Sequence, residues 1–165
     1  MTEATLLPEG ILRFRGATFR AALGRAGIAT RKHEGDGGTP LALLPLRRVL
    51  YRADRIAKPR TLTPTEPIAP SDGWCDDPRH QDYNRPVTLP HPASHEALWR
   101  QDPLYDLIGV LGWNDAPIEP HRGSAIFLHL ATPDYAPTAG CIALSQPDLL
   151  TILSQGLTAI RIAGA

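Results

Sequence analysis

A histidine and a cysteine that could act together lie twelve residues apart, His129 in the segment IFLHL and Cys141 in the segment TAGCIAL. A cysteine acts as a nucleophile when its thiolate is accessible and a base lies within hydrogen-bonding reach. The small pair Ala139-Gly140 predicts a tight turn whose backbone amides can point at an oxyanion. The residues alone leave two interpretations open: a nucleophile with its base, or a strand-end histidine and a buried thiol packed in a core.

Several predicted strands have to position these two residues. Apolar and branched runs predict buried strands in LYDLIGVLGW and in GSAIFLHL, and a further short strand over Cys141–Leu144. Upstream, Ile11–Arg15 and Thr18–Leu23 are typical of a hairpin joined near Gly16. The segment LALLPLRRVLYR predicts a strand region in which Pro45 marks a bulge or an edge position, and LTAIRIA predicts a last strand.

Two short helices are expected between the strands. Ser145, with a proline and an acidic residue in the turn that follows, predicts a helix that runs to about Gln155 and stops at Gly156. Ser94–Gln101 is the second candidate helix, with Ser94 as its cap.

Residues 59–92 are rich in proline and poor in apolar runs, which predicts a long ordered excursion over the sheet. Long loops inside compact domains are often functional. The whole pattern predicts a single, mainly β domain over residues 1–165, with one or two short helices and this long loop excursion.

The composition argues against several classes of protein. The chain has 165 residues, 42% of them hydrophobic, and a formal net charge of zero, so it can build one globular core but lacks the basic surface of a nucleic-acid-binding protein. Two cysteines without a CxxC pair, Cys75 and Cys141, argue against a disulfide framework and a cysteine-rich zinc site. No apolar segment has the roughly 18 residues of a membrane span. The N-terminal MTEATLLPEGILRF lacks the pattern of a signal peptide.

The segments IFLHL and TAGCIAL together are similar to the signature of the YkuD-type L,D-transpeptidase family, in which a strand-end His is followed by [Ser/Thr]-x-Gly-Cys. The upstream DGGTPLALLPL resembles the family's Thr-Pro-x-Gly-x-Phe stretch less closely. The two matches bracket residues 35–144. The resemblance implies a β-sandwich-like fold with few helices, which agrees with the strands predicted above.

The resemblance also implies roles for individual residues. Cys141 would be the nucleophile, His129 its base, and the amides of Gly140 and Cys141 the donors to the oxyanion, with Thr138 shaping the turn. The implied activity acts on peptidoglycan stem peptides: the thiolate attacks the carbonyl of the third residue, expels D-alanine, and an amine of a neighbouring stem resolves the thioester. The resemblance implies no metal and no organic cofactor. We expect a monomer in the periplasm, without nucleic-acid or membrane partners.

The chain departs from the family pattern beside the nucleophile. The family usually has His before Gly-Cys and Arg two residues after Cys, where this chain has Ala139 and Ala143. A proteobacterial branch of the family that links diaminopimelate to the L-alanine amine of the acceptor is similar to this chain. The alternatives are a cysteine L,D-carboxypeptidase or amidase that trims peptidoglycan, and a catalytically silent wall-binding module.

Further residues are candidates for substrate contacts. The segment SDGWCDDPRHQDYNRPV concentrates aromatic, acidic and amide groups that either wall a peptide groove or anchor the excursion. Others flank the strands that lead to the nucleophile or belong to the basic run RRVLYRADRIAKPR. The candidates are Trp74, Tyr83, Asn84, Asn114, Arg122, Ser124, Tyr51 and Arg52.

The excursion also contains potential metal ligands. They are Asp76, Asp77, His80, His91 and His95. Pro92 falls between His91 and His95 and breaks the helical face that an i, i+4 ligand pair would need. We therefore expect no metal site, and we expect Cys75 to be a structural thiol.

Overall fold

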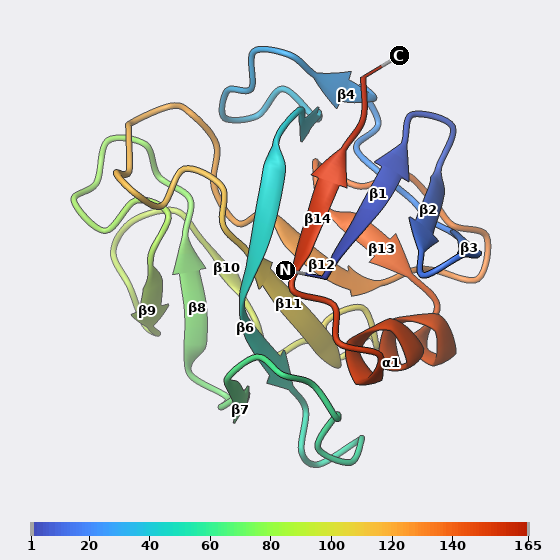
Figure 1. Cartoon of the computed structure of the whole chain (residues 1–165). Helices are drawn as coiled ribbons and strands as arrows, with labels where there is room; N and C mark the ends of the chain where they lie inside the picture. Colours follow the sequence, from blue (N-terminus) through green and yellow to red (C-terminus); the bar gives the residue numbers. More distant parts are fainter. Residues whose placement is uncertain (1, 165) are drawn as a thin grey trace.

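The computed structural model describes residues 2–164, and its main feature is one curved mixed sheet with the strand order β13-β12-β11-β6-β14-β1-β2-β3 (Figure 1). A short strand, β7, pairs with β6 beside this path. The strands are β1 (Glu3–Leu7), β2 (Ile11–Phe14), β3 (Ala17–Arg20), β4 (Ile28–Ala29), β5 (Thr39–Pro40), β6 (Leu43–Tyr51), β7 (Thr65–Pro67), β8 (Asp72–Cys75), β9 (Pro86–Thr88), β10 (His95–Ala97), β11 (Leu107–Leu111), β12 (Phe127–Leu130), β13 (Ile142–Leu144) and β14 (Ala159–Ile162), and the helix is α1 (Gln146–Ser154).

The two edges of this sheet meet, so that it nearly closes on itself. Ala22, just after β3, exchanges two backbone hydrogen bonds of 2.9 Å with Ala143 on β13, although these segments lie at opposite ends of the strand order. In the middle of the sheet, β14 runs parallel to β1 and antiparallel to β6, and it separates them. The closure brings the chain that follows β3 next to the segment around Cys141.

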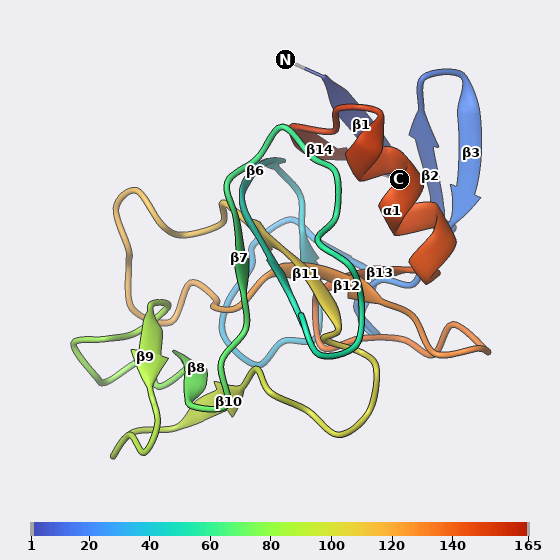
Figure 2. The ribbon, with the colours of Figure 1, turned by 90° about the horizontal axis from the view of Figure 1, so that it is seen from below.

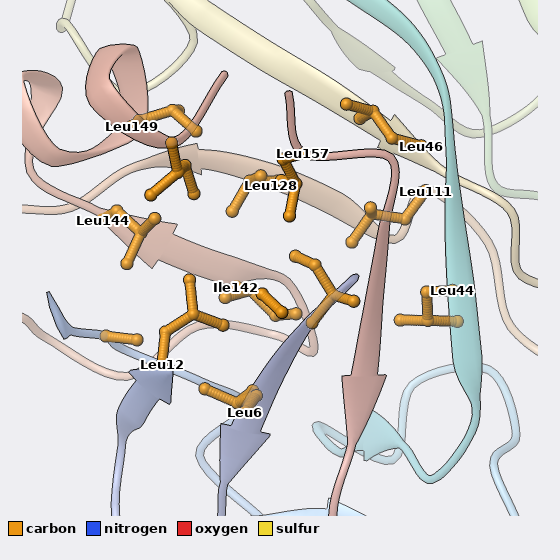
Figure 3. Packing of buried hydrophobic residues seen from close by; sticks show 14 of the residues in the cluster. Leu6, Leu12, Leu44, Leu46, Leu111, Leu128, Ile142, Leu144, Leu149 and Leu157 are labelled. Atoms are coloured by element: carbon orange, nitrogen blue, oxygen red, sulfur yellow. The ribbon is translucent and has the colours of Figure 1, made fainter. Parts of the chain in front are cut away.

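Alternating residues of β12 and β13 face two different cores. Leu128 and Ile142 belong to the large core, which α1 covers with Leu149 and further buried residues (Figure 3). Phe127 and Cys141 belong to a second, smaller core. Because β12 is buried on both faces, burial alone does not reveal which of its faces carries a functional residue.

The smaller core lies beneath a separate three-stranded sheet, β10-β8-β9, built from the excursion. This small sheet lies on the side of the molecule away from β2 and β3 in both views (Figures 1 and 2). Trp74 on β8 packs edge-on against Phe127 of β12, with ring centroids 5.2 Å apart. The excursion is therefore attached to the strand that carries His129.

The mainly β fold class is confirmed, and so are most of the predicted elements. The hairpin forms β2 and β3, and Ser145 caps α1 by accepting a hydrogen bond from the Asp148 amide. Gly156, with a φ of 93°, follows the helix. The register between β6 and β11 shifts at Arg47, so the bulge lies two residues after Pro45 and not at it, and β6 is an interior strand and not an edge.

The predicted helix over Ser94–Gln101 is wrong. Residues 95–97 form β10, in which Glu96 stands opposite Trp74 of β8, so strand pairing prevails over the local capping signal. The strand β1 was not predicted. In the described part of the chain, no helix has the length and the apolar character that crossing a membrane requires.

Candidate active site

His129 and Cys141 lie on the same face of two adjacent parallel strands. His129 stands opposite Ala143, and Cys141 directly precedes β13, two residues before Ala143. Side chains two residues apart on a strand share a face of the sheet, so both groups point to the same side. Both residues line one cleft with a volume of about 340 Å³. The structure thus brings the predicted nucleophile and the predicted base together.

The turn before Cys141 is fixed by Thr138. The Thr138 hydroxyl donates to the Cys141 carbonyl at 2.6 Å and accepts from the Gly140 amide at 3.1 Å. Gly140 has a φ of 140°, and a Cβ at this position would lie 2.8 Å from the Gly38 carbonyl oxygen. The position therefore requires glycine, both for its backbone conformation and for the close approach of a second loop.

That second loop leads into β5, the Thr-Pro pair of the stretch DGGTPLALLPL. The Thr39 hydroxyl is fully buried, donates to the Gly140 carbonyl at 2.9 Å and accepts from the Gly24 amide at 2.9 Å. Earlier in the same loop, Lys32 and Asp36 form an ion pair that stabilises the conformation of the loop. The Thr-Pro stretch thus supports the turn from behind.

The Cys141 thiol is buried and protonated at rest. Its Sγ–H donates to the Ala125 carbonyl at 3.3 Å, and its sulfur accepts from the Phe127 amide at 3.4 Å. Burial, followed by the nearby Glu96 carboxylate, raises the pKa of Cys141 to about 12. Cys141 therefore rests as a thiol at neutral pH.

His129 is held in the tautomer that a base needs. Its Nδ1 lies 2.9 Å from the Leu130 carbonyl, which can only accept, so Nδ1 carries the proton and Nε2 offers a lone pair. Burial lowers the pKa of His129, which keeps the ring neutral. The ring packs edge-on against Tyr105, with centroids 5.3 Å apart. Within residues 2–164, no hydrogen bond joins His129 to Cys141.

The two amides expected to bind an oxyanion differ in their availability. The Gly140 amide already donates to the Thr138 hydroxyl, so its place in this structure is to hold the turn. The Cys141 amide has no hydrogen-bond partner among the described residues. The free donor at the turn is therefore the amide of Cys141 itself.

Charged residues that the sequence did not single out line the cleft. They are Arg25, Lys32, Glu34, Glu96 and Arg100, and Asp76, considered above only as a potential metal ligand, lines it too. Tyr105, which also lines the cleft, donates its hydroxyl to Glu96 at 2.9 Å, and burial raises the pKa of Glu96. The sequence does not reveal Glu96 because its segment carries a helix signal, and no motif surrounds Glu34 or Arg100.

Two of the predicted contact residues lie at the cleft. Thr138 and Ser124 line it, and the Ser124 hydroxyl donates to Glu34 at 2.6 Å. The Tyr83 hydroxyl donates to the same oxygen of Glu34 at 2.7 Å and accepts from the Gly123 amide. Tyr83 is buried behind the cleft and supports its wall.

The other excursion residues also act as supports. The Asn84 side chain accepts from the Ala125 amide and from the Trp74 indole, and it donates to two carbonyls of the loop at residues 113–114. Asn84 thereby anchors the residue whose carbonyl receives the Cys141 thiol. Of the two interpretations of this segment, the structure favours loop anchoring over a groove wall.

Four further candidates do not line the cleft. Asn114 bonds to the backbone of its own loop, and Arg122 pairs with Glu119 at the surface. Arg52 forms an ion pair with Asp54 and stacks 3.5 Å from the centroid of Trp99, and Tyr51 packs against the large core. Cys75 is a buried free thiol on β8.

A comparison with family models finds a match for this chain. The YkuD model, described as the L,D-transpeptidase catalytic domain, matches residues 10–159. This range contains the hairpin, the Thr-Pro loop, His129 and the Gly140–Cys141 turn. No curated protein matches the chain.

Proposed function

The chain belongs to the L,D-transpeptidase catalytic domain family, and on that premise we propose that it crosslinks peptidoglycan stem peptides with Cys141 as its nucleophile. The observation that carries the proposal is the placement of Cys141 and His129 on one face of two adjacent strands, where both line one cleft. A thiol beside a neutral imidazole with a free Nε2 is what acyl transfer requires.

In the first half-reaction the thiol turns from the Ala125 carbonyl toward His129, and Nε2 takes its proton. The Phe127 amide, 3.4 Å from the sulfur, stabilises the thiolate that forms. Sulfur then attacks the carbonyl of the third stem residue, and the Cys141 amide donates to the resulting oxyanion. When this intermediate collapses, the bond to D-alanine breaks, and the amine of D-alanine leaves with the proton held by His129.

In the second half-reaction an amine of a neighbouring stem attacks the thioester. His129 removes a proton from that amine, the carbon–sulfur bond breaks, and the sulfur regains a proton from the imidazole. The Glu34 carboxylate in the cleft wall favours an amine acceptor over water, because it attracts the ammonium form, which gives one proton to solvent before the neutral amine attacks. We propose the L-alanine amine of the acceptor stem as the attacking group.

Ala139 and Ala143, beside Cys141, cannot bind the carboxylates of the substrate, so other groups of the cleft must bind them. Ala143 lines the cleft without a charge where the family usually has Arg. Arg25 and Arg100 line the same cleft. We therefore assign recognition of the stem carboxylates to these two guanidinium groups. A periplasmic location, where the polymer lies, belongs to the same proposal.

The test is incubation of the purified chain with disaccharide-tetrapeptides, with the products identified by mass spectrometry. A crosslinked dimer with loss of one D-alanine supports transpeptidation, and its fragmentation identifies the acceptor amine. Tripeptide alone would replace the proposal with the carboxypeptidase alternative. Unchanged substrate, under conditions in which the chain is folded, would leave only a wall-binding module.

A further inference from the structure

Away from the cleft, the excursion brings together three metal-ligating side chains, His80, Asp82 and His91. One ligand atom from each lies within 4.8 Å of the other two. Asp82 Oδ2 lies 3.0 Å from His91 Nε2 and 3.7 Å from His80 Nδ1. Two ligands at zinc distance on a tetrahedral ion are roughly 3.4 Å apart. The spacing of the three atoms is therefore close to that of a coordination shell.

We propose that His80, Asp82 and His91 bind a zinc-class divalent cation. Two imidazoles and one carboxylate suit Zn²⁺, whereas Ca²⁺ and Mg²⁺ prefer shells made of oxygen. Three protein ligands leave at least one coordination position to water. The sequence predicted no metal site because Pro92 prevents His91 and His95 from sharing a helical face. The three ligands proposed here lie in two loops, so that argument does not apply to them.

The tautomers at rest show what binding would change. His80 Nδ1 accepts the Asp82 amide at 3.0 Å, so it carries a lone pair, and the cation would take the place of that amide hydrogen. His91 Nδ1 accepts the Ala93 amide at 3.2 Å, so its proton lies on Nε2 and points at Asp82. Binding moves this proton to Nδ1 or releases it to solvent, and the contact with Ala93 lengthens.

A cation at this position would join two loops of the small sheet. His80 and Asp82 lie between β8 and β9, and His91 lies between β9 and β10. Asp82 directly precedes Tyr83, whose amide bonds to the His80 carbonyl and whose hydroxyl bonds to Glu34 in the cleft wall. The cation would thus stabilise the excursion in the conformation that supports the cleft.

The direct test titrates tag-free, chelator-treated chain with Zn²⁺ against a chromophoric competitor. We expect one ion per chain with a dissociation constant in the micromolar range or below, and a loss of about a hundredfold in affinity in His91→Ala and in Asp82→Asn. His33→Ala is the matched control, because the His33 side chain is 70% exposed and is not one of the proposed ligands. This variant should bind zinc as tightly as the parent chain. No binding at micromolar zinc, or equal affinity in all variants, would overturn the proposal.

A second measurement does not depend on how the variants fold. The parent chain loaded with Co²⁺ should show the visible bands of a four- or five-coordinate site with nitrogen and oxygen ligands. A strong sulfur-to-metal charge-transfer band would place the ion on a cysteine and contradict the proposed ligands. Neither readout uses transpeptidation, so failure of this site and failure of the proposed function are distinguishable.

Discussion

The Thr39 hydroxyl donates a hydrogen bond of 2.9 Å to the carbonyl of Gly140, the residue directly before Cys141. The same hydroxyl accepts from the Gly24 amide. A single side chain therefore joins the loop after β3, the Thr-Pro stretch of β5 and the turn that presents Cys141. This contact explains physically why a Thr-Pro stretch and a Gly-Cys turn occur together in the chain.

Replacing Thr39 with Val should destabilise the chain and lower its activity. Valine matches threonine in shape but leaves the buried Gly24 amide and Gly140 carbonyl without partners, which costs about 1–3 kcal/mol for each such group. Urea unfolding measures the loss. Thr39→Ser keeps the hydroxyl and should recover most of the stability; equal losses in both variants would mean that packing of the methyl group matters more than the hydrogen bonds.

Cys141→Ala should abolish product formation while the chain stays folded. Loss of a nucleophile usually lowers the rate by many orders of magnitude, and alanine fits the turn without strain. Mass spectrometry of the products and circular dichroism measure the two effects. Cys75→Ala is the control, because Cys75 lies on β8, and it should retain most activity. An active Cys141→Ala variant would remove the assignment.

His129→Gln should lose turnover but leave the pH profile of Cys141 alkylation nearly unchanged. Glutamine can still donate to the Leu130 carbonyl, but it cannot take a proton. Because no hydrogen bond in the described chain joins the two residues at rest, the resting pKa of Cys141, about 12, does not depend on the imidazole. Iodoacetamide rates measured against pH test this. A profile shifted upward in the variant would show that a thiolate–imidazolium pair forms before substrate binds.

Glu96→Gln should make Cys141 more reactive at moderate alkaline pH. The Glu96 carboxylate raises the pKa of Cys141, so removing its negative charge favours the thiolate and lowers that pKa. The substitution preserves the local packing, since the oxygen of the new amide can still accept the Tyr105 hydroxyl. The measurement is the alkylation rate between pH 8 and about 10, around the ordinary pKa of cysteine. A slower rate than in the parent would contradict this electrostatic argument.

Gly140→Ala should destabilise the chain more than Gly16→Ala does. Both glycines have a positive φ, but only at Gly140 would the added methyl group also collide with another part of the chain. The new Cβ would meet the Gly38 carbonyl oxygen at 2.8 Å. Gly16→Ala is the matched control, because Gly16 also has a positive φ, of 79°, but nothing lies within 4 Å of its added Cβ. We expect about 1–2 kcal/mol of lost stability in the control and a larger loss at Gly140. Equal losses would show that the Gly38 loop moves away at little cost.

The sequence was sufficient where a local signal and the tertiary structure agree. The cap of α1 is a contact between Ser145 and the amide three residues later, and the hairpin pairs two strands that are adjacent in the chain. Both depend only on local residues. Ser94 shows the reverse case, because the segment after it pairs with β8 across a gap of about twenty residues that no local pattern reports.

The candidate site divides along the same line. His129 and Cys141 were predictable because the family signature spans both of them. The support given by Tyr83 and Asn84, and the presence of Glu96 in the cleft, arise from loops that meet only in the folded chain. Composition identified the excursion as important but not the direction in which its side chains point.

The position of β14 has a consequence for the order in which the molecule can assemble. Every strand that it contacts precedes it in the chain, yet it separates β6 from β1 in the middle of the sheet. Until residues 159–162 are synthesised, β6 and β1 each lack one of their strand neighbours, because β14 lies between them in the sheet. Pairing partners more than 150 residues apart, such as Glu3 and Ala159, also carries the entropic cost of closing a very long loop. Folding of the large core therefore waits for the C-terminal strand, and a nascent chain that stalls before it exposes two apolar sheet edges to aggregation.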